Sequence, residues 1–154
     1  HQPTEESEGL SMDLSPQALW KQLKNLNFAG RRILLAEDND LNAEIAGDIL
    51  ETAGIEVDYA FDGQQAVDKA LQSSFGYYDM IFMDIHMPQL TGYQAARQIR
   101  CSKRLDLQEV PIVAVTANAF ADDIEAARLA GMNGHLTKPI NIGQLIKILE
   151  TMFR

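Results

Sequence analysis

The sequence has a single cysteine and no long hydrophobic run. Cys101 alone cannot form an internal disulfide, so we expect a reducing compartment and a cytoplasmic location. No stretch approaches the roughly 18 apolar residues that a membrane span requires, and the acidic, polar N-terminus does not resemble a signal peptide. We therefore expect no direct membrane contact by this chain, although a longer parent protein could be membrane-anchored.

Basic residues are also scarce. The chain has 13 Lys and Arg against 22 Asp and Glu, which gives a formal net charge of −9. This balance disfavours nonspecific binding to nucleic acid, and we expect no nucleic-acid partner. The 154 residues are 46% hydrophobic and 23% charged, which is ordinary for one globular domain with a short extension.

The extension is at the N-terminus. Residues 1–14 contain four acidic residues and no Lys or Arg, which is typical of a flexible linker. Within residues 15–30, Ser15 is a good N-cap, and leucines at Leu19, Leu23 and Leu26 predict a short amphipathic helix that also carries Trp20. That helix could pack on its own domain or connect to a preceding one. Because the chain begins with His1 rather than Met, we expect either a fragment of a longer chain or a tag remnant at this end.

From residue 32 onward, apolar stretches alternate with helical patterns. Strands are predicted at 32–37, 55–60, 79–84, 111–117 and 134–139, and helices begin near residues 39, 63, 91, 121 and 141. Leu41, Ile45 and Ile49 align at helical spacing in the first of these helices. Five strands alternating with five helices predict an α/β domain, with a parallel sheet covered by helices on both faces.

Polar residues stand where four of the five strands end. Ligands of open parallel sheets bind outside the carboxyl ends of the strands, so these residues are expected to converge on one edge. The strand 79–84 is apolar until it ends in an aspartate, which makes that carboxylate the centre of interest. The converging residues are Glu37, Asp38, Asp84, Thr116 and Lys138, with the small Ala117 behind the threonine.

Each of these residues alone has an ordinary structural explanation. Asp38 or Asn39 could cap a helix, and Thr116 is at home in a strand. Together, however, bare carboxylates repel by roughly 4 kcal/mol per pair at 4 Å and an effective dielectric of 20. Such a cluster is stable with a cation, and hard oxygen ligands favour Mg²⁺. A metal, a lysine and a hydroxyl around one carboxylate suit phosphoryl transfer with the carboxylate as nucleophile.

The stretches "ILLAEDNDLNAEIA", "DMIFMDIHMPQLTGYQAARQIR", "PIVAVTANA" and "GMNGHLTKPI" resemble the receiver domain of two-component response regulators. The resemblance covers about residues 31–153 and implies a flavodoxin-like (βα)5 fold, with a doubly wound parallel sheet in the strand order 2-1-3-4-5. It divides the chain into a linker at 1–14, a connector helix at 15–30 and a receiver domain at 31–154. It also implies Mg²⁺ as the cofactor and a cis peptide bond between Lys138 and Pro139.

The resemblance assigns roles residue by residue. Asp84 resembles the phospho-acceptor, Thr116 and Lys138 resemble the residues that contact the phosphoryl group, and Asp38 resembles a direct metal ligand. Glu37 would reach the metal through water, and His86 would supply its backbone carbonyl.

Asn118, Ala117 and His135 resemble the switch and modulator residues of the family, and the side chain of His86 has a second role here. The side chains of His86 and Asn118 would flank the path of the water that hydrolyses the acyl phosphate, and Ala117 is the small residue after Thr116. His135 stands where receivers usually have an aromatic ring. We expect it to turn inward in its neutral form on phosphorylation, so that the switch weakens below neutral pH.

The stretches "AEDNDLNAEIA" and "GMNGHLTKPI" look most like receivers fused to hybrid sensor histidine kinases. This implies a histidine kinase or a histidine phosphotransfer domain as phosphodonor. A downstream protein would bind the face formed by the helix near 121–130, the strand at 134–139 and the last helix. A receiver catalyses its own phosphorylation and dephosphorylation, and the parent chain could be a histidine kinase.

Four alternatives remain open at this point. One is a degenerate receiver that serves only as a docking module, although the presence of all five polar residues argues against it; the other three are as follows. The first is a free-standing response regulator. The second is an aspartate-nucleophile phosphatase of the haloacid dehalogenase type, which resembles this chain less because its D-x-D pattern belongs at the end of the first strand. The third is a flavodoxin-like FMN binder, which would need a phosphate-binding loop where this chain has "EDNDLN".

Overall fold

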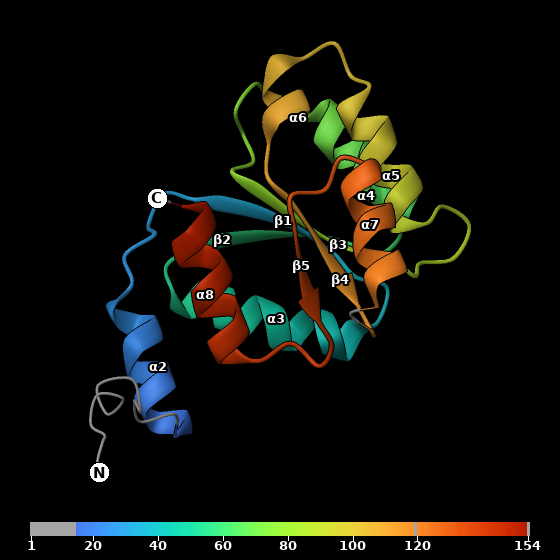
Figure 1. The fold of residues 1–154 in the computed structure, drawn as a ribbon. Coiled ribbons are helices and arrows are strands. Elements are labelled where there is room, and N and C mark those ends of the chain that lie inside the picture. The colour runs from blue at the N-terminus through green and yellow to red at the C-terminus, as the bar shows by residue number, and fades with distance from the viewer. Residues whose placement is uncertain (1–14, 119, 154) are drawn as a thin grey trace.

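The computed structural model describes residues 15–118 and 120–153, so the linker expected at 1–14 lies outside the described residues. A single five-stranded sheet forms the centre of the domain, with all pairings parallel and the order β2-β1-β3-β4-β5 (Figure 1). The strands are β1 (Arg32–Ala36), β2 (Glu56–Ala60), β3 (Met80–Asp84), β4 (Ile112–Thr116) and β5 (Gly134–Thr137). The expected fold class and strand order are confirmed.

Helices connect the strands and precede the first of them. They are α2 (Pro16–Asn25), α3 (Asp40–Thr52), α4 (Gly63–Gln72), α5 (Gly92–Arg100), α6 (Leu105–Glu109), α7 (Ala121–Leu129) and α8 (Ile142–Met152). Side-chain oxygens of Ser15, Asn39 and Asn141 cap α2, α3 and α8 by accepting backbone N–H groups. Because Asn39 rather than Asp38 caps α3, the capping explanation for Asp38 is wrong.

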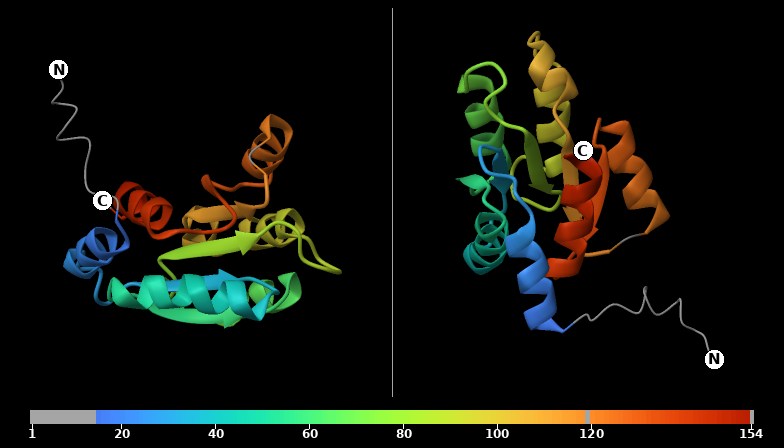
Figure 2. Two further views of the ribbon diagram at one scale, coloured as in Figure 1. Left: turned by 90° about the horizontal axis from the view of Figure 1, so that it is seen from below. Right: turned by 90° about the vertical axis from the view of Figure 1, so that its left-hand side faces the viewer.

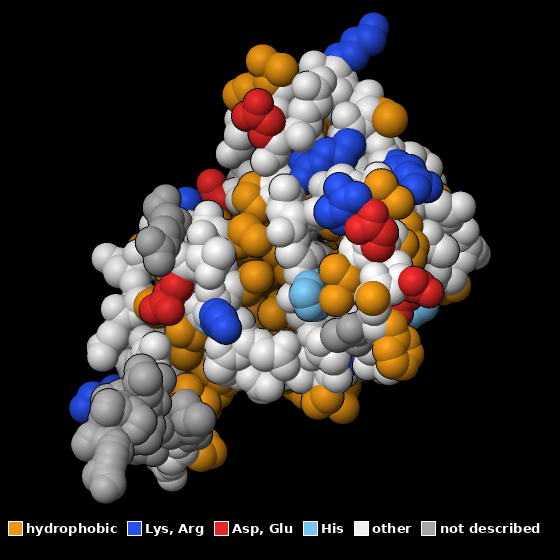
Figure 3. Space-filling model, in the orientation of Figure 1, with side chains coloured by type: hydrophobic (Ala, Val, Ile, Leu, Met, Phe, Trp, Pro, Cys, Tyr) orange, Lys and Arg blue, Asp and Glu red, His pale blue; other side chains and the backbone are white. Residues whose placement is uncertain are grey.

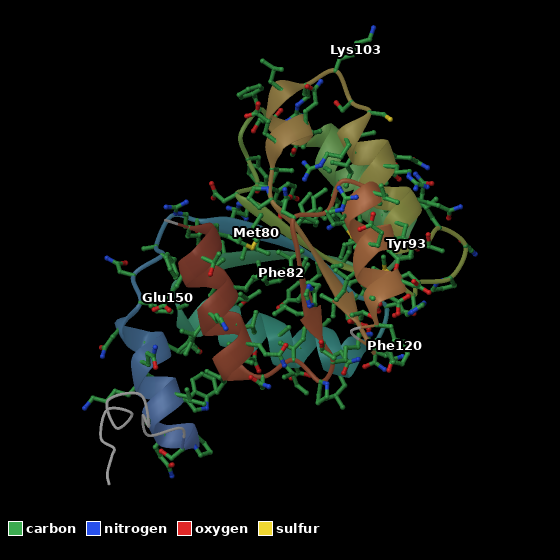
Figure 4. All side chains as sticks on the ribbon, in the orientation of Figure 1. Met80, Phe82, Tyr93, Lys103, Phe120 and Glu150 are labelled. Carbon is green, nitrogen blue, oxygen red and sulfur yellow. The ribbon has the colours of Figure 1, made fainter. Side chains whose placement is uncertain are left out.

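The sheet divides the hydrophobic core into two layers. On one face, α4, α5, α6 and α7 pack against the strands, and on the other α2, α3 and α8 do so. Met80 and Phe82 of β3 belong to the core layer on the second face, together with residues of α3 and α8 (Figure 4). All five residues of β3 and of β4 are buried, because a strand in the middle of a parallel sheet is covered on both sides.

Helix α2 packs on the domain. Leu23 is completely buried, and α2 contacts both α8 and α3, as two further views show (Figure 2). The chain then runs through Phe28, whose ring meets that of Phe153 edge to face at a centroid distance of 5.2 Å. Hydrophobic contacts at both ends of this segment therefore fix α2 beside the sheet, although it precedes the first strand.

Two features of the helices were not predicted from the sequence. Helix α6 was not predicted, because five residues are too few to give a periodic pattern. Leu41 and Ile45 align with Ile49 in sequence, but they are 64% and 44% exposed. The buried side of α3 consists of smaller residues together with two larger ones, namely Ala43, Ala46, Gly47, Ile49 and Leu50.

Helix α7 is weakly attached to the rest of the domain. Ala127 is its only buried residue, and its N-cap, Phe120, makes no side-chain capping bond. The hydroxyl of Tyr93 on α5 donates a hydrogen bond to the carbonyl of Asp123 at 3.3 Å. Tyr93 and Phe120 are labelled next to α7 in Figure 4. Within the described residues, none of the helices combines the length and the apolar character needed to cross a membrane.

Candidate functional site

The register of the sheet brings the polar strand ends to one level. Ala36 of β1 pairs with Met83 of β3, so Glu37 follows its strand beside Asp84. On the other side Asp84 pairs with Val115, which places Thr116 one residue further along β4. The predicted convergence at the carboxyl edge therefore follows from strand pairing alone.

Three carboxylates and one ammonium group meet there. The carboxylates of Glu37, Asp38 and Asp84 each offer an oxygen within 4.8 Å of the others. The Nζ atom of Lys138, directly after β5, lies 2.8 Å from Asp84 Oδ2 and 3.5 Å from Glu37 Oε1. Asp84 is 1% exposed and Glu37 is 3% exposed, whereas Asp38 faces solvent.

Burial and charge perturb two groups of this cluster. Burial, followed by repulsion from the Asp84 carboxylate, raises the pKa of Glu37 to about 7, although the backbone N–H of Asn39 and the charge of Lys138 oppose that change. Burial would lower the pKa of Lys138, but its bonds to Asp84 and Glu37 outweigh that effect and raise it. Lys138 is therefore firmly charged and still does not neutralise three carboxylates.

This residual negative charge fits a divalent cation. The available donors are carboxylate oxygens, which Mg²⁺ prefers, and the exposed position of Asp38 leaves access from solvent. Within the described residues, the same three side chains form the one cluster of potential metal ligands. The residues present therefore fit the expected metal.

The loop after β3 contacts the carboxylate of Asp84 through its backbone. The backbone N–H of His86 donates to Asp84 Oδ1 at 2.9 Å, while the His86 side chain is exposed. Gly92, at the start of α5, packs directly on this loop, because a Cβ atom there would lie 2.3 Å from the Asp84 carbonyl oxygen. In the sequence, Gly92 and the preceding Pro88 indicate a loop after the strand, but not that Gly92 packs against the site.

Thr116 is buried next to the cluster, but its hydroxyl is engaged elsewhere. Thr116 Oγ1 donates to the carbonyl of Asn118 at 2.7 Å and accepts the N–H of Asn118 at 3.1 Å. Ala117, Asn118 and His135 are all exposed. The structure thus brings Lys138 into contact with Asp84, whereas the Thr116 hydroxyl is hydrogen-bonded to the backbone of Asn118. His135, which stands where receivers usually have an aromatic ring, is exposed. The Lys138–Pro139 bond is cis, as the resemblance implies.

A doubly wound five-stranded sheet with a carboxylate cluster and a lysine at its carboxyl edge defines the receiver class of signalling domain. Comparison with known families agrees, since the model of the response regulator receiver domain matches residues 33–150. The chain therefore belongs to the response regulator receiver domain family.

Several relatives are hybrid kinases. The chain is 39% identical over 120 residues to hybrid signal transduction histidine kinase L of Dictyostelium discoideum and 43% identical over 127 residues to the osmosensing histidine protein kinase SLN1 of Saccharomyces cerevisiae. These matches cover 77% and 80% of this chain but only 7% and 10% of the kinases. By contrast, the match to the response regulator DivK of Brucella ovis, at 29% identity, covers 79% of this chain and 94% of that protein.

Two solved structures are informative neighbours. The receiver domain of sensor histidine kinase PA1611 from Pseudomonas aeruginosa, with a magnesium ion coordinated in its active site cleft, is 41% identical with a TM-score of 0.72, and the match covers 80% of this chain and 98% of that one. The co-crystal structure of the S. cerevisiae histidine phosphotransfer protein Ypd1 with the Ssk1 receiver domain gives 37% identity and a TM-score of 0.72, with 81% and 90% coverage.

Proposed function

We propose that this chain accepts a phosphoryl group from phosphohistidine on Asp84 and acts as the receiver segment of a hybrid sensor histidine kinase. The observation that carries the proposal is the environment of Asp84. Its carboxylate is buried at the tip of β3, lies 2.8 Å from the Lys138 ammonium, and has two further carboxylates within 4.8 Å. The similarity to the receivers of hybrid kinases supports the wider assignment.

In the transfer, a carboxylate oxygen of Asp84 forms a bond to phosphorus while the bond between phosphorus and the donor's imidazole nitrogen breaks. The imidazole leaves with the electron pair of that bond, and the product is an acyl phosphate. The Lys138 ammonium neutralises charge on the phosphoryl oxygens, and the Thr116 hydroxyl can donate to one of them after giving up the Asn118 carbonyl.

Mg²⁺, when bound, would supply additional positive charge to the phosphoryl oxygens. Asp38 and Asp84 would hold it directly, Glu37 through water, and His86 through its backbone carbonyl. The carboxylate cluster and the magnesium-bound PA1611 receiver support this assignment. The phosphodonor would be a histidine kinase or a histidine phosphotransfer protein, as the Ypd1–Ssk1 complex suggests. The surface of α7, β5 and α8 would bind the downstream protein.

Acetyl phosphate with and without Mg²⁺ tests the proposal. Intact-protein mass spectrometry should find one base-labile phosphoryl group in the presence of Mg²⁺, and peptide mapping should locate it at Asp84. The Asp84→Asn variant should lose the modification and keep its circular dichroism spectrum. Asp40→Asn, which changes an exposed carboxylate in the first turn of α3, is the matched control and should be modified normally. Equal modification of the Asp84→Asn variant would refute the assignment.

A further inference from the structure

An apolar groove lies between α2, α3 and the segment that joins β5 to α8. Its volume is about 510 Å³, and most of its lining is hydrophobic: Leu19, Trp20, Ile45, Ile49, Ile140 and Ile142. In the space-filling view, hydrophobic side chains gather along the lower left edge, beside α2 (Figure 3). An apolar groove of this size on a small domain is a feature of interaction sites.

One wall of this groove lies outside the receiver domain. The family match covers residues 33–150, whereas Leu19 and Trp20 belong to α2. Leu23 on the same helix is completely buried and fixes α2 against the domain. Leu19 and Trp20 are only partly buried, so part of the apolar surface of α2 is accessible to a partner.

The groove continues to the phosphoacceptor site. Ile45 and Ile140 line it, and the same two residues line a smaller cavity of about 40 Å³ together with Glu37 and Lys138. A protein that brings a phosphohistidine to Asp84 must approach beside Lys138 and therefore covers this rim. Ile45 is 44% exposed, so the surface next to the reacting carboxylate is itself apolar.

We infer that α2 extends the docking surface for a protein phosphodonor, and that Trp20 anchors apolar side chains flanking the donor's phosphohistidine. The inference rests on the proposed function of Asp84 and adds a part of the donor's binding surface that lies outside the residues matched by the receiver family. Insertion of apolar side chains into a groove walled by helices is a common mode of recognition, and buried tryptophans often dominate such interfaces. A small phosphodonor reaches Asp84 without entering the groove, which separates docking from chemistry.

The test compares phosphorylated Ypd1 with acetyl phosphate as donors to the same chain. For each variant, the rate of transfer from Ypd1 is divided by the rate of transfer from acetyl phosphate. Replacing Trp20 by Ala should lower this ratio by about tenfold, the typical cost of removing an anchoring tryptophan. Gln22→Ala is the matched control, since Gln22 is exposed on α2 and does not line the groove. Thermal melting of both variants shows whether α2 remains packed. Asp48→Lys, at the rim of the groove, supplies a second variant that removes no core contact.

Trp20 is also the only tryptophan, so its indole N–H gives a single NMR signal in the ¹⁵N-labelled chain. That signal should shift when unlabelled Ypd1 is added. Two results would overturn the docking inference and leave the proposed function intact. In the first, acetyl phosphate phosphorylates the wild-type chain but phosphorylated Ypd1 does not. In the second, the ratio of the two transfer rates is unchanged in both Trp20→Ala and Asp48→Lys. An indole signal that depends on the concentration of the chain itself and not on Ypd1 would assign the groove to a second copy instead. Failure of both donors on the wild-type chain would refute the proposed function.

Discussion

The ammonium group of Lys138 lies 2.8 Å from Asp84 Oδ2, although the two residues are separated by 54 positions in the sequence. Lys138 follows the edge strand β5, and Asp84 ends the central strand β3. The same ammonium lies 3.5 Å from Glu37 Oε1, so it compensates two buried carboxylates. It therefore pairs with these carboxylates in the absence of a metal, and it would compete with a bound cation for the same oxygens.

Lys138→Met tests this competition. Removing the ammonium abolishes its repulsion of a cation, so Mg²⁺ should bind severalfold more tightly, while phosphorylation by acetyl phosphate should become slower. Without metal, the variant should melt at a lower temperature because two buried carboxylates lose their partner. Lys147→Met, an exposed lysine on α8, is the control. Isothermal titration calorimetry measures the affinity, and unchanged or weaker binding in the Lys138 variant would contradict the prediction.

Glu37 should make Mg²⁺ binding depend on pH. Its pKa of about 7 means that the free protein carries a proton on Glu37 at pH 6, which a cation must displace. Affinity should therefore rise as the pH increases from 6 to 8, and proton release on binding should fall over the same interval. Calorimetry in buffers of different ionisation enthalpy counts the protons. The Glu37→Gln variant should release none, and equal release by both proteins would show that another group titrates.

Glu37 also affects stability in the absence of metal. The pKa of Glu37 is raised from 4.5 to about 7 in the folded state. Between pH 4.5 and about pH 7, the folded protein therefore binds more protons than the unfolded one. The contribution of Glu37 to stability should accordingly decrease as the pH rises through this interval.

Gly92→Ala should damage the site through the backbone. The new Cβ would lie 2.3 Å from the Asp84 carbonyl oxygen and 2.7 Å from Ile85 Cα, so the loop after β3 must move. We expect a loss of about 1–3 kcal/mol in the free energy of unfolding and a slower reaction with acetyl phosphate. Gly143→Ala in the first turn of α8 is the matched control, because its nearest contact is 3.4 Å away and alanine favours helix. Urea titration compares the two, and equal effects would refute the special role of Gly92.

Much of the fold and the composition of the site follow from the sequence. Alternating strand and helix patterns give a parallel sheet, and a parallel sheet brings the ends of β1, β3, β4 and β5 to one edge. The sequence could not predict which side of α3 is buried, because Leu41 and Ile45 have the correct helical spacing and still project into solvent. The same limit applies to Gly92 and to the Asn118 carbonyl that engages Thr116, since contacts through the backbone leave no side-chain pattern.

The lifetime of the acyl phosphate should depend on His86 and Asn118. Both side chains are exposed and follow Asp84 and Thr116 by two residues, on loops that border the buried carboxylate. Replacing both by Ala should open the approach of water and accelerate dephosphorylation severalfold. The decay of the phosphorylated species, followed by mass spectrometry after removal of acetyl phosphate, gives the rate. Asn25→Ala, at the end of α2, should leave the rate unaltered, and a double variant that decays like the wild type would show that both are ordinary loop residues.

The hydroxyl of Thr116 should act as the switch between the site and α7. It now donates to the carbonyl of Asn118 at 2.7 Å, and a phosphoryl group on Asp84 offers a stronger, charged acceptor. Transfer of that donation would release the loop that leads into α7, a helix with Ala127 as its only buried residue. A ligand can shift such an equilibrium only by contacts that differ between the two states, and this hydrogen bond is that contact.

Phosphorylation should therefore change amide hydrogen exchange in residues 117–118 and 120–130 and turn the exposed His135 side chain inward. In Thr116→Val, phosphorylation should still occur but leave exchange in α7 unaltered, whereas Thr137→Val, the neighbour of Thr116 on β5, should respond like the wild type. Identical exchange across α7 with and without the phosphoryl group in the wild-type chain would refute the switch, because the helix would then have no second state to occupy.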